Sequence, residues 1–241
     1  MKHEHVTTPF GPVDLEVWRG GSAPTVVLRP GSVDLIAGVK AARATIYGAR
    51  QIGATRVLEI VAARPLDRLL PEDSYAIPHD LVDLTRGRYL TFFEGKGYGF
   101  LPQHTPFCPE MRAALVRAAR LAKPTSAARG IFAAVDRWDD LGEARRWGAH
   151  FGAIAISPTA FLARELELCY APLCLLGGPG TDVNKVITEM IDHLPGERDC
   201  PCAMAMQATR ERGYGKRRGD AEPGHRPSGL RSRRLHVVRR H

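Results

Sequence analysis

The sequence has little that would place the chain in a membrane or in an extracellular disulfide framework. No stretch approaches the roughly 18 uninterrupted apolar residues that a membrane-spanning helix needs, and residues 1–5 lead into no apolar signal segment. The five cysteines are an odd number, unlike the even sets of disulfide-stabilised domains. No repeat with a period of roughly 20–50 residues is visible. We therefore expect a cytoplasmic protein that is not built from repeats.

The cysteines also lack the spacing of a metal site. Only Cys200 and Cys202 lie close together in the sequence, and no second Cys or His pair stands near them to complete a tetrahedral set of ligands. Cys169 and Cys174 fall in an apolar stretch, where a buried thiol behaves as a small hydrophobic side chain. We expect these two thiols in the core, and we expect neither a metal nor a cofactor.

The positive charge is concentrated at one end. The formal net charge is +8, and residues 209–241 alone carry it, so the rest of the chain is neutral. This last segment is rich in Gly, Pro and Arg and lacks apolar periodicity, as disordered tails do. Tyr214 is its only aromatic residue, which argues against base stacking. We expect one domain over residues 1–208, a disordered basic tail over residues 209–241, and neither a specific nucleic-acid partner nor a membrane partner.

The neutral part alternates short apolar runs with helical patterns. At 241 residues, 44% hydrophobic and 25% charged, the chain suits one large α/β domain. Residues 25–28 and 56–62 have the β-branched content of buried strands, and residues 36–52 show the apolar spacing of a helix. The alternation predicts a mostly parallel sheet covered by helices. Further strands are expected at residues 75–78, 81–84, 130–135 and 173–176, and further helices at residues 111–121, 141–148, 159–168 and 182–194.

Seven segments carry motifs that are weak singly and specific as an ordered set. They are Thr8–Gly11, Leu70–Asp73 before Ile77-Pro78, Asp83–Thr85, Thr91–Gly95, Pro106–Glu110, Trp147–Ala149 and Phe161–Ala171. Together they resemble the nucleoside phosphorylase superfamily, and within it the methylthioadenosine phosphorylase branch. The resemblance implies an α/β fold with a mixed sheet curled toward a barrel and surrounded by helices. It also implies a small-molecule ligand and a homo-oligomer, commonly a trimer, whose active sites borrow residues from a neighbour.

The phosphate site that the resemblance implies is largely replaced. Arg29 matches the Arg of an Arg-His pair, but Pro30 stands in place of the His. Val61 occupies a position where a phosphate-binding hydroxyl is expected, and the Gly-rich phosphate loop of the family has no counterpart. A phosphate dianion needs several convergent donors, because an unpaired buried charge costs several kcal/mol. We expect Arg29 and Val61 to line a cleft that no longer suits phosphate.

The nucleoside side of the site is replaced as well. The family's Glu-Gly-Pro-Arg-Phe signature reads Asp136–Asp140 here, and its Met-Thr pair under the ribose reads Ile154-Ala155. Its Asp-x-Asp, which reads the purine, falls on Gly178-Pro179-Gly180. A leaving purine needs a proton or a hydrogen bond as the glycosidic bond breaks, which glycine side chains cannot supply. The cleft is therefore expected to be larger and more apolar, with Ile154 and Gly178 among its ligand-binding residues.

Three residues are candidates for acid–base catalysis. Glu59 interrupts an apolar strand, so it either faces outward, pairs with Arg29 or Arg56, or serves as a general acid or base. Asp136 follows a predicted strand, where its side chain would face a cleft. His104 precedes Pro106–Glu110, a segment that in the family approaches a neighbour's active site, although a loop histidine commonly faces solvent.

Three aromatic residues complete the candidate ligand site. Trp138 is either a stacking wall or an interface residue, and the neighbouring Asp139 and Asp140 are expected to cap a helix. Phe107 lies in the segment that approaches a neighbour, and Tyr98 lies in a glycine-rich loop that would serve as a lid or remain a plain surface loop.

The leading hypothesis is an enzyme with the phosphorylase fold whose cleft serves a bulkier, more apolar molecule, in a biosynthetic reaction without phosphate. The alternatives are a divergent phosphorylase or nucleosidase for 5′-substituted nucleosides and a non-catalytic binding subunit.

Overall fold

Two long strands form the centre of the molecule. In this computed structural model, β4 (Arg56–Pro65) and β9 (Cys169–Leu176) run in parallel over residues 56–63 and 169–176. Every residue of β9 is buried, which explains its nearly continuous apolar sequence. The structure describes residues 1–19, 24–29, 39–93, 101, 103–123, 125–177 and 183–211.

The strands form an open, mixed sheet. Its order is β1-β2-β3-β4-β8-β7-β6, with β9 beside β4 and β5 beside β9. Half of the pairings are antiparallel, so the expectation of a mostly parallel sheet was wrong. The sheet does not close into a barrel, because β1 and β6 end the path. The remaining strands are β1 (Lys2–Thr8), β2 (Gly11–Trp18), β3 (Thr25–Leu28), β5 (Ser74–Ala76), β6 (Asp80–Asp83), β7 (Ile131–Ala134) and β8 (Phe151–Ala153).

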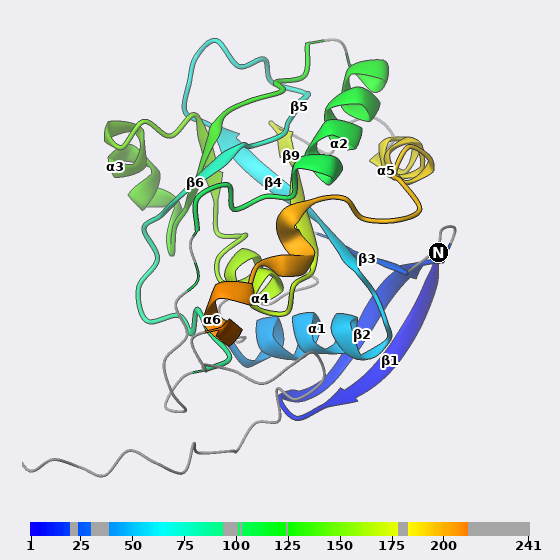
Figure 1. Cartoon of the computed structure of the whole chain (residues 1–241). Coiled ribbons are helices and arrows are strands. Elements are labelled where there is room, and N and C mark those ends of the chain that lie inside the picture. Colours follow the sequence, from blue (N-terminus) through cyan, green and yellow to red (C-terminus); the bar gives the residue numbers. More distant parts are fainter. Residues whose placement is uncertain are drawn as a thin grey trace, which may run out of the picture.

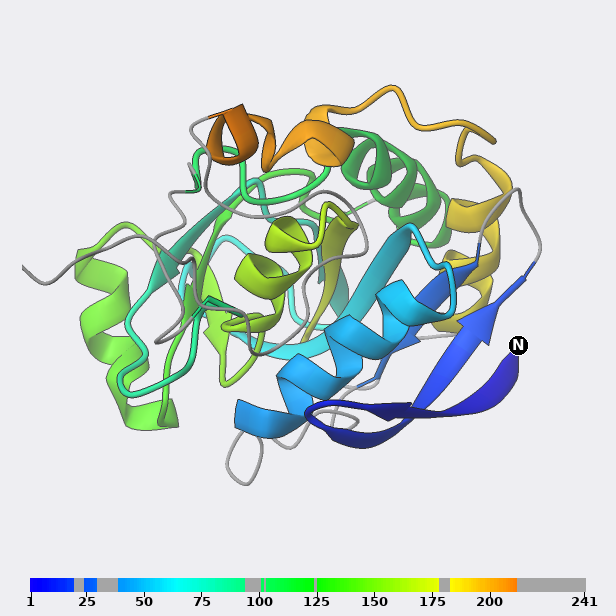
Figure 2. The same ribbon diagram turned by 60° about the horizontal axis from the view of Figure 1, so that its bottom comes forward.

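The antiparallel hairpin of β1 and β2 is the main element that the sequence patterns did not predict. Its two strands turn at Gly11, whose φ of 118° suits a residue without a Cβ. Leu15 and Val17 are buried while Asp14 is exposed, the alternation of a strand with one covered face. The hairpin lies at the edge of the molecule and packs against α1 (Val39–Gln51) (Figures 1 and 2).

Helices cover the two faces of the β4–β9 pair, and side chains of β4 alternate between them. Val57 and Val61 pack in a core with α1 and α4 (Thr159–Glu165). Leu58 and Ile60 pack in a second core with α2 (Pro109–Ala122) and α5 (Val183–Asp192). We call these the α1/α4 face and the α2/α5 face. α3 (Leu141–Arg146) packs near β8 (Figure 1).

The C-terminal segment that the structure describes crosses in front of β9 (Figure 1). It contains the short helices η2 (Pro201–Met204) and α6 (Gln207–Glu211), whereas η1 (Trp138–Asp140) precedes α3. Thr209 is buried, and Arg210 forms an ion pair of 2.8 Å with Glu167. Residues 209–211 of the predicted tail therefore belong to α6, and residues 212–241 lie outside the described part.

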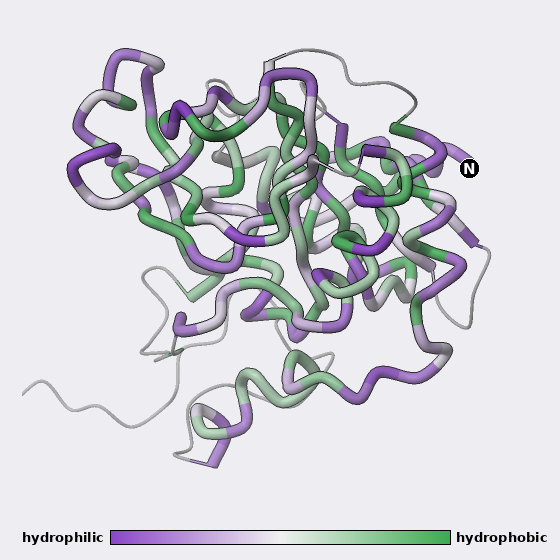
Figure 3. The backbone as a smooth tube through the Cα atoms, turned by 90° about the horizontal axis from the view of Figure 1, so that it is seen from above, coloured by the Kyte–Doolittle hydropathy of each residue, from purple (hydrophilic) through white to green (hydrophobic). Residues whose placement is uncertain are grey.

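The apolar segments gather in the interior, as the hydropathy colouring shows (Figure 3). None of the helices in the described part has the length and apolar character to cross a membrane.

Candidate active site

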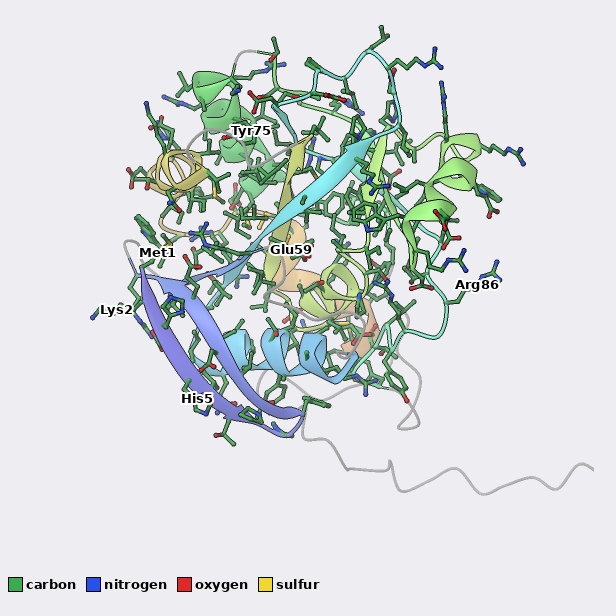
Figure 4. The ribbon with its side chains drawn as sticks, turned by 180° about the vertical axis from the view of Figure 1, so that it is seen from behind. Met1, Lys2, His5, Glu59, Tyr75 and Arg86 are labelled. Atoms are coloured by element: carbon green, nitrogen blue, oxygen red, sulfur yellow. The ribbon has the colours of Figure 1, made fainter. Side chains whose placement is uncertain are left out.

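Glu59 lies inside the protein, on the α1/α4 face of β4. Its side chain is at the middle of the molecule (Figure 4), and the residue is 6% exposed. The Tyr170 hydroxyl donates to Glu59 Oε2 at 2.5 Å, and the Ile156 amide donates to Oε1 at 3.3 Å. The interpretations of Glu59 as outward-facing or as a partner of an arginine are therefore wrong, because helices cover both faces of β4.

This environment favours the protonated form of the carboxyl group. Burial raises the pKa of Glu59, and the hydrogen bonds from Tyr170 and Ile156 offset only part of that effect. Burial, reinforced by the Glu59 charge, also raises the pKa of Tyr170 well above its ordinary value. A carboxyl group that keeps its proton toward neutral pH is the chemical requirement for a general acid.

The chain segment beside Glu59 has an unusual backbone. Ile156 is fully buried and has a φ of 71°, a left-handed conformation that is strained for a β-branched residue. Ser157 donates to Asp83 Oδ2 at 2.9 Å, and the Thr85 hydroxyl donates to Asp83 Oδ1 at 2.7 Å. Such strain persists where surrounding contacts impose it, and it is concentrated at functional sites.

Asp136 follows β7, as expected, but an arginine engages its carboxylate. The Arg88 guanidinium bonds Asp136 Oδ1 at 2.7–2.9 Å and also donates to the Ser157 and Val135 carbonyl oxygens. The Arg86 amide donates to Asp136 Oδ2 at 2.7 Å. Glu59 and Asp136 thus contact the same 156–157 segment, the first directly and the second through Arg88.

Arg29 is held by a carboxylate. Its Nε and Nη2 donate to the two oxygens of Glu16 at 2.8 and 2.9 Å, and Nη2 also donates to Asn184 Oδ1 at 2.8 Å. The hydrogen bonding to Glu16 raises the pKa of Arg29 further. The charge that would attract a phosphate is therefore already balanced.

The other predicted site residues fall into separate places. Phe107 is buried in its own chain, 6.1 Å from the Tyr170 ring centroid, and Val61 lies in the same core. Ile154 packs in a different cluster near α3. Trp138 stacks on the Arg64 guanidinium at 4.3 Å, and His104 is exposed. Tyr98 and Gly178 lie outside the described residues.

The comparisons with known proteins agree with this architecture. A family model described as the phosphorylase superfamily matches residues 2–204. The chain belongs to the phosphorylase superfamily. An S-methyl-5′-thioadenosine phosphorylase of Thermofilum pendens is 26% identical over 85% of this chain and 89% of the relative. A probable 6-oxopurine nucleoside phosphorylase of Thermococcus kodakarensis is 27% identical over 86% and 91%.

Solved structures confirm the phosphorylase fold. The crystal structure of a methylthioadenosine phosphorylase from an Antarctic soil metagenomic library superposes with a TM-score of 0.74 at 20% identity. The match covers 86% of this chain and 84% of that chain. The superfamily indicated by the seven sequence segments is thus confirmed, and the name of the Thermofilum pendens relative agrees with the branch.

The surroundings of Glu59 and Asp136 include residues that sequence reasoning missed. Tyr170 stood inside one of the quoted motifs but carried no signal of its own, since a tyrosine in an apolar strand usually packs in the core. Arg88 and Ser157 also went unnoticed, because their roles depend on partners far away in the sequence.

A second carboxyl group is also kept partly protonated. Glu165, at the end of α4, accepts a 2.7 Å hydrogen bond from the Phe92 amide. Burial raises its pKa to about 7, although hydrogen bonds from Thr91 and Phe92 and the charge of Arg43 oppose the shift. Glu165 therefore ties the 91–92 segment to α4 in a pH-dependent way.

The cysteines give the clearest correction to the sequence analysis. Cys169 and Cys174 are buried, as expected. Four thiols nevertheless come together on the α2/α5 face, with their sulfur atoms all within 4.8 Å of one another. The sequence argument against a tetrahedral set was wrong, because the fold supplies two ligands from distant segments. The four are Cys108, Cys169, Cys200 and Cys202.

Proposed function

We propose that this member of the phosphorylase superfamily is an enzyme that acts on a bulkier and more apolar small molecule than a nucleoside, without phosphate as a co-substrate. The observation that carries the proposal is the double hydrogen bond between Arg29 and Glu16. Arg29 is the residue retained from the implied phosphate pair, and its guanidinium is already neutralised. A second anion would have to displace a charge-assisted pair.

Glu59 is the proposed proton donor. Its burial raises the pKa of the carboxyl group, and Tyr170 and Ile156 fix the positions of the two oxygens. Val61 follows on the same face of β4, where an apolar side chain suits an uncharged ligand better than phosphate. Asp136 and Arg88 act as positioning residues, since they hold the 156–157 segment rather than present a free base.

The test is release of free purine from methylthioadenosine and from inosine, with and without phosphate, at micromolar protein. We expect no appreciable release, because each lost transition-state contact costs about 10²–10³ in rate. A nucleoside phosphorylase assayed in parallel controls for the substrates. Robust phosphate-dependent release would establish the second candidate, a divergent nucleoside phosphorylase, which the names of the relatives favour.

Native mass spectrometry of freshly purified protein supplies the positive evidence. We expect a co-purified apolar molecule, and we expect Glu59→Gln to abolish its turnover while retaining its binding. Glu189→Gln, at a half-buried position of α5 where the carboxylate pairs with His193, is the matched control. Full turnover by Glu59→Gln would remove Glu59 from the mechanism, and binding without any turnover would identify a binding subunit.

We also propose a homotrimer, from the retained Pro106–Glu110 motif. Because Phe107 is buried in its own chain, the exposed His104 is the residue of this region that would reach a neighbour. Light scattering is expected to give three times the mass of one chain, and a mass near the single-chain 26.4 kDa would rule out a shared site.

A further inference from the structure

Four buried thiols from three distant segments meet at one point of the α2/α5 face. Cys108 immediately precedes α2, Cys169 begins β9, and Cys200 and Cys202 lie at η2. Every pair of their sulfur atoms is within 4.8 Å, and the Cys169 and Cys200 sulfurs are 3.3 Å apart. Four mutually close sulfurs are close enough to bind one ion together, whereas disulfides need the sulfurs only in pairs.

We propose that these four cysteines bind one zinc ion as a closed, structural site. Zinc with sulfur ligands at about 2.3 Å requires sulfur–sulfur edges of about 3.8 Å in a tetrahedron. One sulfur pair lies at 3.3 Å and every pair lies within 4.8 Å, so small rotations of the side chains would suffice. Soft thiolate ligands in a tetrahedral set favour zinc over magnesium or calcium.

Binding would require no change of oxidation state. Each of the four thiols gives its proton to the solvent, and the four thiolates bind Zn²⁺, which leaves a net charge of minus two on the site. Cys108 stands at the N-cap of α2, where the helix dipole favours a thiolate.

Two arginines lie where they would balance that charge. Arg198 Nη1 is 3.9 Å from the Cys169 sulfur, and it is held there by a 2.9 Å bond to the Glu167 carbonyl oxygen. Arg56 is paired with Cys169 in the register of β4 and β9, so both side chains leave the sheet on the same face. Arg56 is buried; its Nη2 donates to the Pro195 carbonyl oxygen at 2.6 Å, and its Nε has no hydrogen-bond partner among the described residues. A buried guanidinium is costly unless a negative charge is near.

The surroundings favour a structural site over a catalytic one. All four ligands come from the protein and are buried in the core that contains Leu58, Ile60 and Met111, so no position is left for water or substrate. The ion would join the start of α2, the start of β9 and the C-terminal segment. Figure 1 shows that last segment passing in front of β9.

The deciding experiment is a cobalt titration of the full chain after complete reduction and after removal of any bound metal with a chelator. Cobalt in a tetrathiolate site gives intense sulfur-to-metal charge-transfer absorption, whose intensity scales with the number of thiolates. We expect saturation at one cobalt per chain, displacement of cobalt by zinc, and zinc in the freshly purified protein by elemental analysis. The titration decides the question whatever metal the protein carries on purification.

Two matched variants locate the site. Cys202→Ser is expected to weaken cobalt binding at least tenfold and to reduce the charge-transfer band. Cys174→Ser is expected to change neither, because Cys174 is equally buried but lies outside the cluster. Should Cys202→Ser fail to fold, the band intensity of the wild-type protein still reports the number of thiolates.

Three results would overturn the proposal. One is a reduced protein that leaves cobalt in its octahedral aqueous form. Another is equal loss of the spectrum in Cys174→Ser. The third is a purified protein with disulfides among the four cysteines which, once reduced, binds no cobalt.

Discussion

The two faces of the β4–β9 pair bury ionisable groups in opposite ways. On the α1/α4 face, the Glu59 carboxyl is held by a phenol and an amide, and burial raises its pKa and so favours the protonated form. On the α2/α5 face, four thiols gather beside arginines. The adjacent residues Cys169 and Tyr170 begin β9 and point to different faces, so one strand serves both sites. Buried polar groups in one sheet can thus be stabilised either by protonation or by coordination and opposite charge.

Removal of the proposed metal should change the melting temperature more than any other perturbation, and it should disturb only the α2/α5 face. Structural zinc sites contribute folding free energy directly, so a strong chelator is expected to lower the melting temperature by roughly 10 °C or more. Calorimetry with and without chelator measures this shift, and the chelator should have a smaller effect on Cys202→Ser, which binds the metal more weakly. An unchanged melting temperature in the wild-type protein would show that the thiols alone stabilise this face.

Glu165→Gln tests the effect of a buried acid on the α1/α4 side. The pKa of Glu165 is raised from 4.5 to about 7 in the folded state, so the folded protein binds more protons than the unfolded chain. The contribution of Glu165 to stability is therefore fully present below pH 4.5. Up to about 3 kcal/mol of it is lost as the pH rises from 4.5 through the folded-state pKa of about 7. Urea unfolding between pH 4.5 and 7 should show a flatter profile for the variant. Parallel pH profiles of unfolding free energy for the wild-type protein and the variant would contradict the raised pKa of Glu165.

Two neighbouring substitutions on β9 sharpen the comparison further. Tyr170→Phe removes the hydroxyl that donates to Glu59 and is expected to cost about 1–2 kcal/mol. It should leave cobalt binding unchanged, whereas Cys169→Ala should abolish cobalt binding and leave the pH dependence of stability unchanged. Loss of cobalt binding in Tyr170→Phe would mean that the two faces are not independent.

Truncation after Glu211 should have the smallest effect. The Arg210–Glu167 ion pair and the Met206 amide bond to Glu167 both remain, and residues 212–241 have the composition of a disordered tail. We expect a change in melting temperature of less than about 2 °C. Truncation after Ala205, which removes both contacts, is the matched comparison. A large drop in melting temperature on truncation after Glu211 would mean that the basic tail packs on the folded domain.

The sequence predicted much of the fold because the relevant signals are local. The β3–α1–β4 unit follows from β-branched runs on either side of a helical pattern, and it is present at residues 25–28, 39–51 and 56–65. The hairpin was missed although Leu15 and Val17 alternate with polar residues. Neither strand has an apolar run, because only one face is covered.

The site was less predictable because its contacts are distant in the sequence. Glu59 was identified as a charged residue in an apolar strand, but the sequence could not show that its side chain bonds to Tyr170 and Ile156. The sequence pattern did not indicate that Glu16, on β2 beside β3, would neutralise Arg29 at the end of β3. The thiol cluster likewise depends on the relative placement of three segments, which spacing alone cannot give.

The late position of β9 in the chain has a consequence for biosynthesis. β4 lies roughly a hundred residues before the strand that pairs with it along Arg56–Ala63, and loop closure over such a distance is slow. During synthesis, the apolar edge of β4 stays unpaired until most of the protein has left the ribosome. The growing chain therefore exposes an aggregation-prone strand for a large part of its translation, and chaperone demand should fall sharply once residue 176 has emerged.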